Sequence, residues 1–149
     1  MRAELTTSSL DVTKLIGEVA SPERGATACF IGTVREMNDG RSVQGIEYRA
    51  YEEMAKEELN RILLEAATLH DGVDIAIEHR TGQLGVGEAS VAVVTSHSHR
   101  GPSLDALRFV VEAIKSRLPI WKLELYADGS REWVNAAGDT PAMSDLSGT

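Results

Sequence analysis

Residues 90–125, SVAVVTSHSHRGPSLDALRFVVEAIKSRLPIWKLEL, hold a strand, a helix and a second strand in one uninterrupted run. The apolar residues 90–95 are typical of a fully buried strand. Gly101 and Pro102 begin the helix, because proline is favoured at the first helical position, and Pro119 ends it. Apolar residues at helical spacing predict its buried side: Leu104, Leu107, Val111, Ile114 and Leu118. After Pro119, apolar and polar residues alternate and predict the second strand.

The chain before this stretch contains one strong helical pattern and a weaker one. Residues 52–70 place apolar side chains at i, i+3, i+4 and i+7, which predicts the other main helix. A short helix is expected over residues 10–19, with Ser9 or Asp11 as its cap. Strands are predicted at four more places: a buried one over 26–34, one over 43–51, a half-buried one over 73–77 and a last one around Trp133 and Val134.

Turn signals connect these elements. Asn38-Asp39-Gly40 is a strong turn sequence, so strands 26–34 and 43–51 are expected to pair as an antiparallel hairpin. The glycines between 82 and 87 predict a loop. Strands outnumber helices and pair partly as hairpins, which favours an α+β fold with a mostly antiparallel sheet and two main helices. We expect one domain over residues 1–135 and a flexible tail over 136–149.

Composition excludes several classes of protein. The 149 residues carry a formal net charge of -8, which argues against a general nucleic-acid binder, because phosphate backbones require a basic face. Cys29, the only cysteine, excludes a disulfide scaffold and is expected to be a small buried hydrophobe. No run approaches about 18 apolar residues, and the first seven residues lack the apolar core of a signal peptide. We therefore expect a soluble cytoplasmic protein with no membrane span.

The positive charge is concentrated in one segment. Residues 95–122 contain five basic and two acidic side chains, a local charge of +3, so the remainder carries -11. A basic island in an acidic chain indicates a localised anion site. Because Leu118 and Pro119 make a short connection, Lys115 and Lys122 are expected to reach one pocket, where desolvated lysines serve as acids, bases or nucleophiles. The alternative is two solvated surface lysines.

Two further places combine basic side chains with backbone donors. Ser98-His99-Arg100-Gly101-Pro102 lies where a buried strand meets a helix N-terminus, which favours an anion; the alternative is a simple capping loop. Gly32-Thr33-Val34-Arg35 ends another strand in an arginine suited to phosphate or carboxylate. His97 and His99 share a strand face as metal ligands do, but no third ligand stands at a suitable spacing.

Several motifs together resemble the large, catalytic subunit of molybdopterin synthase, the MoaE family. In chain order they are Phe30-Ile31-Gly32-Thr33-Val34-Arg35, Tyr48-Arg49-Ala50-Tyr51, His79-Arg80-Thr81-Gly82, Gly87-Glu88, Ser98-His99-Arg100 and residues 115–124, KSRLPIWKLE. The resemblance extends from about residue 10 to residue 134.

This resemblance implies a fold of the α/β-hammerhead type and a homodimer. A small ubiquitin-like sulfur-carrier subunit would dock at each end to form a heterotetramer. Its C-terminal Gly-Gly thiocarboxylate would deliver sulfur to cyclic pyranopterin monophosphate and so form molybdopterin, without a metal or redox cofactor. The family pattern implies that Lys115 and Lys122 are catalytic, and it assigns substrate binding to these two lysines and to Thr33, Val34, Arg35, His99, Arg100, Leu123 and Glu124.

Two alternatives from other functional classes remain. One is a non-catalytic module that binds a carrier-protein tail or a pterin phosphate. The presence of both Lys115 and Lys122 favours the enzyme, since a pure binding module requires neither in particular. The other is a metal-dependent hydrolase that uses His97 and His99 and would contain bound metal.

Overall fold

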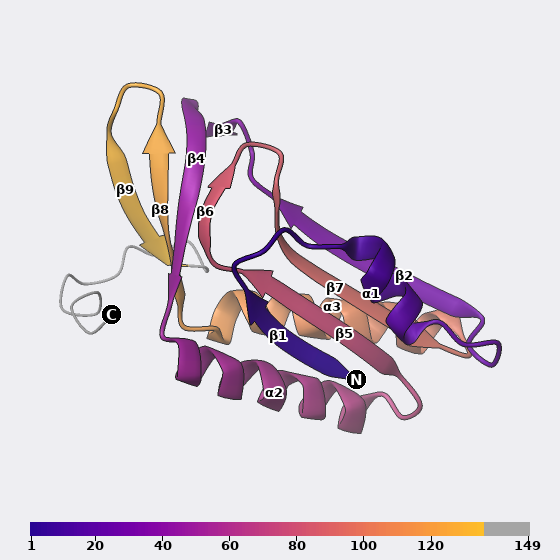
Figure 1. The fold of residues 1–149 in the computed structure, drawn as a ribbon. Helices are drawn as coiled ribbons and strands as arrows, with labels where there is room; N and C mark the ends of the chain where they lie inside the picture. Colours follow the sequence, from indigo (N-terminus) through magenta and orange to yellow (C-terminus); the bar gives the residue numbers. More distant parts are fainter. Residues whose placement is uncertain (136–149) are drawn as a thin grey trace.

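Nine strands and three helices make up residues 1–135, which are the residues that this computed structural model describes (Figure 1). The helices are α1 (Val12–Val19), α2 (Glu52–Leu69) and α3 (Arg100–Arg117). The strands are β1 (Arg2–Thr6), β2 (Ala26–Thr33), β3 (Met37–Asn38), β4 (Arg41–Ala50), β5 (Asp74–Arg80), β6 (Gly82–Gly85), β7 (Ala89–His97), β8 (Ile120–Tyr126) and β9 (Arg131–Asn135). The tail over 136–149 lies outside the described residues.

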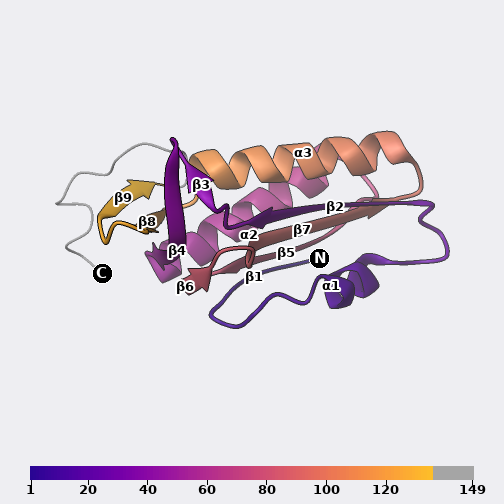
Figure 2. The same ribbon diagram turned by 90° about the horizontal axis from the view of Figure 1, so that it is seen from above.

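The first sheet is covered by helices on both faces. Its strand order is β1-β5-β7-β2, with β1 and β5 parallel and the other neighbours antiparallel. Figure 2 shows α2 and α3 on one face and α1 on the other. The largest apolar cluster lies beneath α2 and α3 and includes Leu59, Ile62, Ile75, Val93 and Val110, all fully buried. Burial of this apolar surface is the main favourable contribution to folding.

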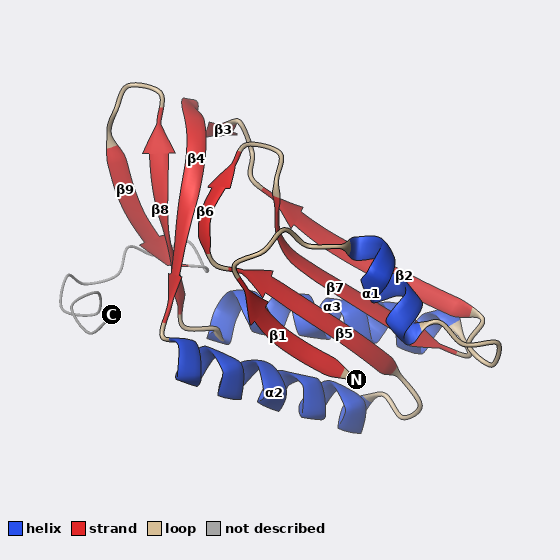
Figure 3. Cartoon of the chain, in the orientation of Figure 1, coloured by secondary structure: helices blue, strands red, loops and turns tan. Residues whose placement is uncertain are grey.

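The second sheet stands at one end of the first (Figure 3). Its order is β3-β4-β8-β9, and β6 also pairs with β4. Where β4 pairs with β6, it has a glycine at position 45. A Cβ on Gly45 would lie 2.8 Å from the carbonyl oxygen of Leu84, closer than packing allows. A smaller apolar cluster supports this sheet and consists of Val34, Val43, Ile46, Leu84 and Tyr126.

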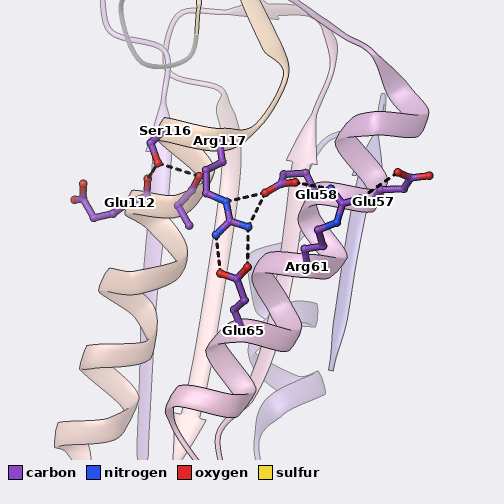
Figure 4. A network of polar contacts seen from close by, with 8 residues as sticks. Glu57, Glu58, Arg61, Glu65, Glu112, Ser116 and Arg117 are labelled. Carbon is purple, nitrogen blue, oxygen red and sulfur yellow. Dashed lines mark hydrogen bonds and ion pairs between the residues drawn. The ribbon is translucent and has the colours of Figure 1, made fainter.

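An ion-pair network fixes the last turn of α3 against α2 (Figure 4). Arg117 donates to Glu58 over 2.7 Å and to Glu65 over 2.6 and 3.0 Å. These hydrogen bonds lower the pKa of Glu65. At Glu58 burial raises the pKa, but the hydrogen bonds from Arg117 and Arg61 outweigh it and lower the pKa. Both carboxylates are therefore charged at neutral pH, and they hold the turn that carries Lys115.

The structure confirms the main sequence predictions. The fold is α+β and mostly antiparallel, with two long helices over the predicted segments and a short α1 capped by Asp11, whose side chain accepts from the Lys14 backbone. Leu118 and Pro119 form the predicted tight connection, in which the Ile120 N–H donates to the Leu118 carbonyl over 2.8 Å. No helix within residues 1–135 is long and apolar enough to cross a membrane.

The predicted hairpin is wrong in its first strand. β2 pairs with β7 along its whole length, from Ala26 opposite His97 to Thr33 opposite Ala89. The chain then crosses to the second sheet, where only Met37 and Asn38 pair with β4. The turn itself is present, because Asp39 and Gly40 both have positive φ. A turn signal locates a reversal of the chain but not the length of the strands that flank it.

Predictions of burial were wrong for two strands. β2 is an edge strand with one exposed face, so Cys29 is exposed instead of buried, and Ile31 is 43% exposed. In β5 the opposite holds: Ala76, predicted on the solvent side, is buried because α1 covers that face. Alternation shows that a strand has two faces, whereas the helices that cover them come from distant sequence.

The other two corrections concern a loop and a helix face. Gly82–Gly85 forms β6 instead of a loop, since it finds a partner in β4. The buried side of α3 is rotated from the predicted one and is rich in small residues: Ser103, Ala106, Val110, Ala113 and Ile114. Small side chains let the helix approach β7 closely, and Thr95 donates a hydrogen bond to the Ser103 carbonyl over 2.8 Å. Leu104, predicted to be buried, is 54% exposed.

The packing of α2 on the first sheet is testable with a pair of leucines on one helix. Leu59 has no exposed surface, so Leu59→Ala is expected to reduce the free energy of unfolding by about 2–5 kcal/mol. Leu64 is 63% exposed, and Leu64→Ala is expected to change it by about 0.5 kcal/mol or less. Urea unfolding of the two variants measures both effects. Equal losses would contradict the assigned helix face.

Candidate functional site

A cavity of about 260 Å³ opens between the turn that links β3 to β4 and the β8–β9 hairpin. Two cations, an amide, a phenol and three carboxylates line it: Arg35, Lys122, Asn38, Tyr126, Asp39, Glu124 and Glu132. Three of them come from β8, where alternation turns residues 122, 124 and 126 to the same side of the sheet. The alternation predicted after Pro119 puts Lys122 and Glu124 on one face, and their ion pair confirms this.

Glu124 is the centre of the polar contacts in this cavity, although only 3% of its surface is exposed. Asn38 donates from Nδ2 to Glu124 Oε2 over 2.6 Å, and the Tyr126 hydroxyl donates to the same oxygen. The Lys122 Nζ lies 3.3 Å from Glu124 Oε1. Each oxygen of the buried carboxylate therefore has a hydrogen-bond donor or a cation beside it.

Opposing effects determine the protonation of Glu124. Burial raises the pKa of its carboxyl group, because a charge is poorly solvated there. The hydrogen bond from Tyr126, the positive charge of Lys122 and the hydrogen bond from Asn38 outweigh burial, so the pKa lies below its ordinary value. Glu124 is therefore an anion at neutral pH, and Lys122 faces a negative charge.

Arg35 enters the cavity from the segment that follows β2. Its Nη2 lies 3.4 Å from Asn38 Oδ1, so the Asn38 amide links Arg35 to Glu124. Arg35 itself is exposed and free to meet a ligand. Its planar guanidinium can bind a phosphate or carboxylate through two hydrogen bonds.

Three other residues of the predicted substrate site are not part of the lining of this cavity. Thr33 is exposed at the end of β2, where the strand register shifts. Val34 and Leu123 are 3% and 5% exposed, and Val34 packs in the apolar cluster under the second sheet. Their side chains therefore support the cavity from behind.

Lys115 borders a different cavity from Lys122. It is an exposed residue in the last turn of α3 and borders a small apolar hollow with Phe30, Val91 and Val111. The two lysines border separate cavities that share no lining residue. That their ammonium groups reach one pocket therefore stays a prediction.

His99 and Arg100 lie at the opposite end of α3. His99 is the residue before the first turn, and both side chains are exposed. Arg100 and Lys115 are about 22 Å apart along the helix axis, given the rise of an α-helix. The basic island of the sequence is thus spread along α3, with Arg108 midway, and continues onto β8 at Lys122.

His97 has a structural role in this arrangement. Its Nε2 lies 3.0 Å from the Asp71 carbonyl, and its Nδ1 accepts from the His99 backbone N–H over 2.9 Å. Both ring nitrogens therefore have backbone partners. Within residues 1–135, no group of three or more His, Cys, Asp and Glu side chains is arranged to hold a metal ion.

Sequence reasoning missed Asn38, Tyr126 and Arg41 as parts of the site. Asn38 counted only as a turn residue, and Tyr126 only as a strand residue. The Arg41 guanidinium stacks on the Tyr126 ring, with Cζ 3.5 Å from the ring centroid. The one available signal was strand alternation, which places Tyr126 two residues beyond Glu124 on the same face.

Comparison with known proteins assigns the chain to a family. The family described as MoaE protein matches residues 5–117, about three quarters of the chain. The chain belongs to the MoaE family. The match includes Lys115 and ends before Lys122 and Glu124.

Individual relatives extend this match over nearly the full length. The molybdopterin synthase catalytic subunit of Bacillus subtilis is 38% identical over 141 residues, which cover 95% of this chain and 89% of that protein. The crystal structure of molybdopterin synthase from Staphylococcus aureus superposes with a TM-score of 0.84 at 30% identity, over 89% of this chain and 97% of that one. A complex of subunits 1 and 2 of the molybdopterin-converting factor from Helicobacter pylori contains a chain that superposes with a TM-score of 0.72 at 26% identity, over 87% of each chain.

Proposed function

We propose that this chain is the catalytic subunit of a molybdopterin synthase, a sulfurtransferase of molybdenum cofactor biosynthesis. It would convert cyclic pyranopterin monophosphate to molybdopterin with sulfur from the thiocarboxylated C-terminus of a small ubiquitin-like carrier subunit. The observation that carries the proposal is the cavity that joins Arg35 and Lys122 to a buried, ionised Glu124. The family membership and the named relatives support the same reaction.

Arg35 and Lys122, two cations among the three carboxylates of this cavity, complement the charge of the reactants. Both the cyclic phosphate and the thiocarboxylate are anions, so a site that brings them together needs fixed cations. Arg35 is exposed for a phosphate or carboxylate group. In each round the carrier's carbonyl carbon loses sulfur and gains an oxygen from water, so the carrier leaves as a carboxylate. Two rounds supply the two sulfur atoms of the product.

The surroundings of the two lysines favour different roles. Lys122 is held against the Glu124 carboxylate and therefore serves as a positioned cation that binds an anionic reactant. Lys115 borders apolar side chains and forms no ion pair within residues 1–135. A lysine without a carboxylate partner is the better candidate for proton transfer or nucleophilic attack. We therefore assign that role to Lys115.

In a dimer, the first turn of α3 in one copy would lie beside the last turn of α3 in the other. β2 pairs with β7 on one side only within residues 1–135, and beside it a groove of about 570 Å³ runs along α3. Its lining is largely apolar and includes Phe30, Leu104, Leu107 and Val111. A two-fold axis through this groove and perpendicular to α3 would align α3 antiparallel to its copy, in an isologous contact that uses the same surface twice. His99 and Arg100 of one protomer would then lie near Lys115 of the other.

Charged residues form the rim of this groove. Asp105, Arg108 and Glu112 line it along α3. In the antiparallel register that sets Arg100 beside Lys115 of the copy, position 108 lies at the two-fold axis, with Asp105 and Glu112 about one helical turn away on either side. We propose a homodimer on the basis of the apolar lining, with one carrier subunit at each of its two sites. The Helicobacter pylori complex of subunits 1 and 2 supports the association with a carrier. We place the reaction in the cytoplasm, where the single free thiol of Cys29 stays reduced.

Reconstitution tests the reaction and the role of Lys115. The protein is mixed with thiocarboxylated carrier and cyclic pyranopterin monophosphate, and molybdopterin is measured over time. Wild type is expected to form product, and Lys115→Ala to slow it by about 100-fold or more, because a proton-transfer group or nucleophile is lost. Lys14→Ala, on the exposed side of α1, is the matched control and is expected to retain full activity.

Each result of that assay has a clear meaning. An inactive wild type that still binds the carrier would favour the non-catalytic binding module. Full activity of Lys115→Ala would contradict the assignment of Lys115.

Complementation tests whether two protomers build one site. Arg100→Ala and Lys115→Ala are each expected to have low activity. When the two are co-expressed in equal amounts, half of the dimers are mixed and each mixed dimer has one intact site, so about one quarter of wild-type activity returns. The mixed protein is compared with each variant alone. Activity no higher than the mean of the two variants would show that each site lies within a single chain.

A further inference from the structure

Glu124 is placed to act on Lys122 and not on a ligand. Only 3% of its surface is exposed. Its Oε2 already accepts from Asn38 and Tyr126, and its Oε1 faces the Lys122 ammonium. A substrate that approached from the cavity would meet Lys122, whose side chain is 23% exposed, before it met this carboxylate. The effect of Glu124 on the reaction therefore passes through Lys122.

Tyr126 is held in place from two sides. Its hydroxyl donates to Glu124, and the Arg41 guanidinium covers its ring at 3.5 Å from the centroid. Arg41 is in turn held by the β8–β9 turn, where it donates to Ser130 and lies 3.6 Å from Asp128. The Tyr126 ring is 3% exposed, so its hydroxyl has a fixed direction toward Glu124.

Asn38 holds the same carboxylate from β3, which lies on the other side of β4 in the sheet. Its Nδ2 donates to Glu124 over 2.6 Å, while its Oδ1 accepts from Arg35 over 3.4 Å. One amide therefore sets the direction of both cations of the cavity, Arg35 directly and Lys122 through Glu124. An aspartate at this position could not do so, because it has no donor to offer Glu124.

We propose that Asn38 and Tyr126 are positioning residues of the sulfur-transfer site, which fix the Lys122 ammonium by holding Glu124 as its partner. This inference rests on the proposed function. It extends the site from the residues that meet the substrate to a layer of two residues, from β3 and β8, that support them. Arg41 completes this layer by holding the Tyr126 ring.

The charges around Glu124 determine how the site responds to pH. The titratable and charged groups near it come from five segments: Arg35 after β2, Asp39 in the turn, Tyr48 on β4, Lys122 and Tyr126 on β8, and Glu132 on β9. The hydrogen bond to Glu124 raises the pKa of Tyr126, so its hydroxyl keeps its proton and remains a donor. The same bond lowers the pKa of Glu124. Removal of the hydroxyl therefore raises the pH at which Glu124 takes up a proton.

The pH dependence of molybdopterin formation tests the proposal. In wild type, Glu124 stays charged to a pH below its ordinary range, so activity is retained there. Tyr126→Phe is expected to move the acidic limb of the pH–activity profile upward by about one pH unit, as the loss of one hydrogen bond to a charged group does. Asn38→Ala removes the other donor and is expected to shift the limb in the same direction. Thermal unfolding shows that each variant is folded.

Two further variants distinguish the positioning of Lys122 through Glu124 from a general loss of structure. In Glu124→Gln the titrating group is absent, so adding Tyr126→Phe is expected to leave the pH profile unchanged. Tyr51→Phe removes a hydroxyl from a ring that packs edge-to-face on Trp121, and it is expected to keep the wild-type profile.

The outcomes distinguish this inference from the proposed function. An inactive wild type would overturn both. An active wild type would overturn the inference alone if the Tyr126→Phe and Asn38→Ala profiles coincided with it. A shift that persisted in the Glu124→Gln background would also overturn the inference, because Tyr126 would then act without Glu124.

Discussion

A buried negative charge, the Glu124 carboxylate, is the constraint on which this site depends. Burial of an unpaired charge costs far more than one domain can tolerate, so its partners are obligatory. They come from β3 in the form of Asn38, and from β8 in the form of Lys122 and Tyr126. The charge therefore holds β3, and the segment that joins it to β2, against β8. As a result Arg35 and Lys122 border one cavity, although 86 positions of sequence separate Asn38 from Glu124.

A second constraint is the length of α3. The helix runs from Arg100 to Arg117, and its rigid rod keeps His99 away from Lys115 within one chain. The ion pairs of Arg117 with α2 fix one end, and the His97 contacts fix the other. A site that uses both ends therefore requires a second copy, and the edge strand β2 supplies an unpaired surface for it. Under the proposed function, this geometry would link catalysis to dimer formation.

The sequence predicted features that depend on local spacing. The two long helices, strand β8 and the shared face of Lys122 and Glu124 follow from periodicity over a few residues. Features set by distant partners were not predictable in this way. Cys29 is exposed because it lies on the uncovered face of β2, which pairs with β7 alone among the described strands, and nothing near Cys29 in sequence records this. Tyr126 and Asn38 are ordinary strand and turn residues until the fold places them on the same carboxylate oxygen.

The ionisation of Glu124 tests the account most directly. The side-chain carboxyl of Glu124 can be observed by ¹³C NMR during a pH titration, with Glu124→Gln to assign its signal. We predict a titration midpoint for Glu124 below the ordinary value for glutamate, about 4.3, and a higher midpoint in Tyr126→Phe. A wild-type midpoint at or above the ordinary value would contradict it, because a neutral Glu124 would leave the Lys122 ammonium without its partner.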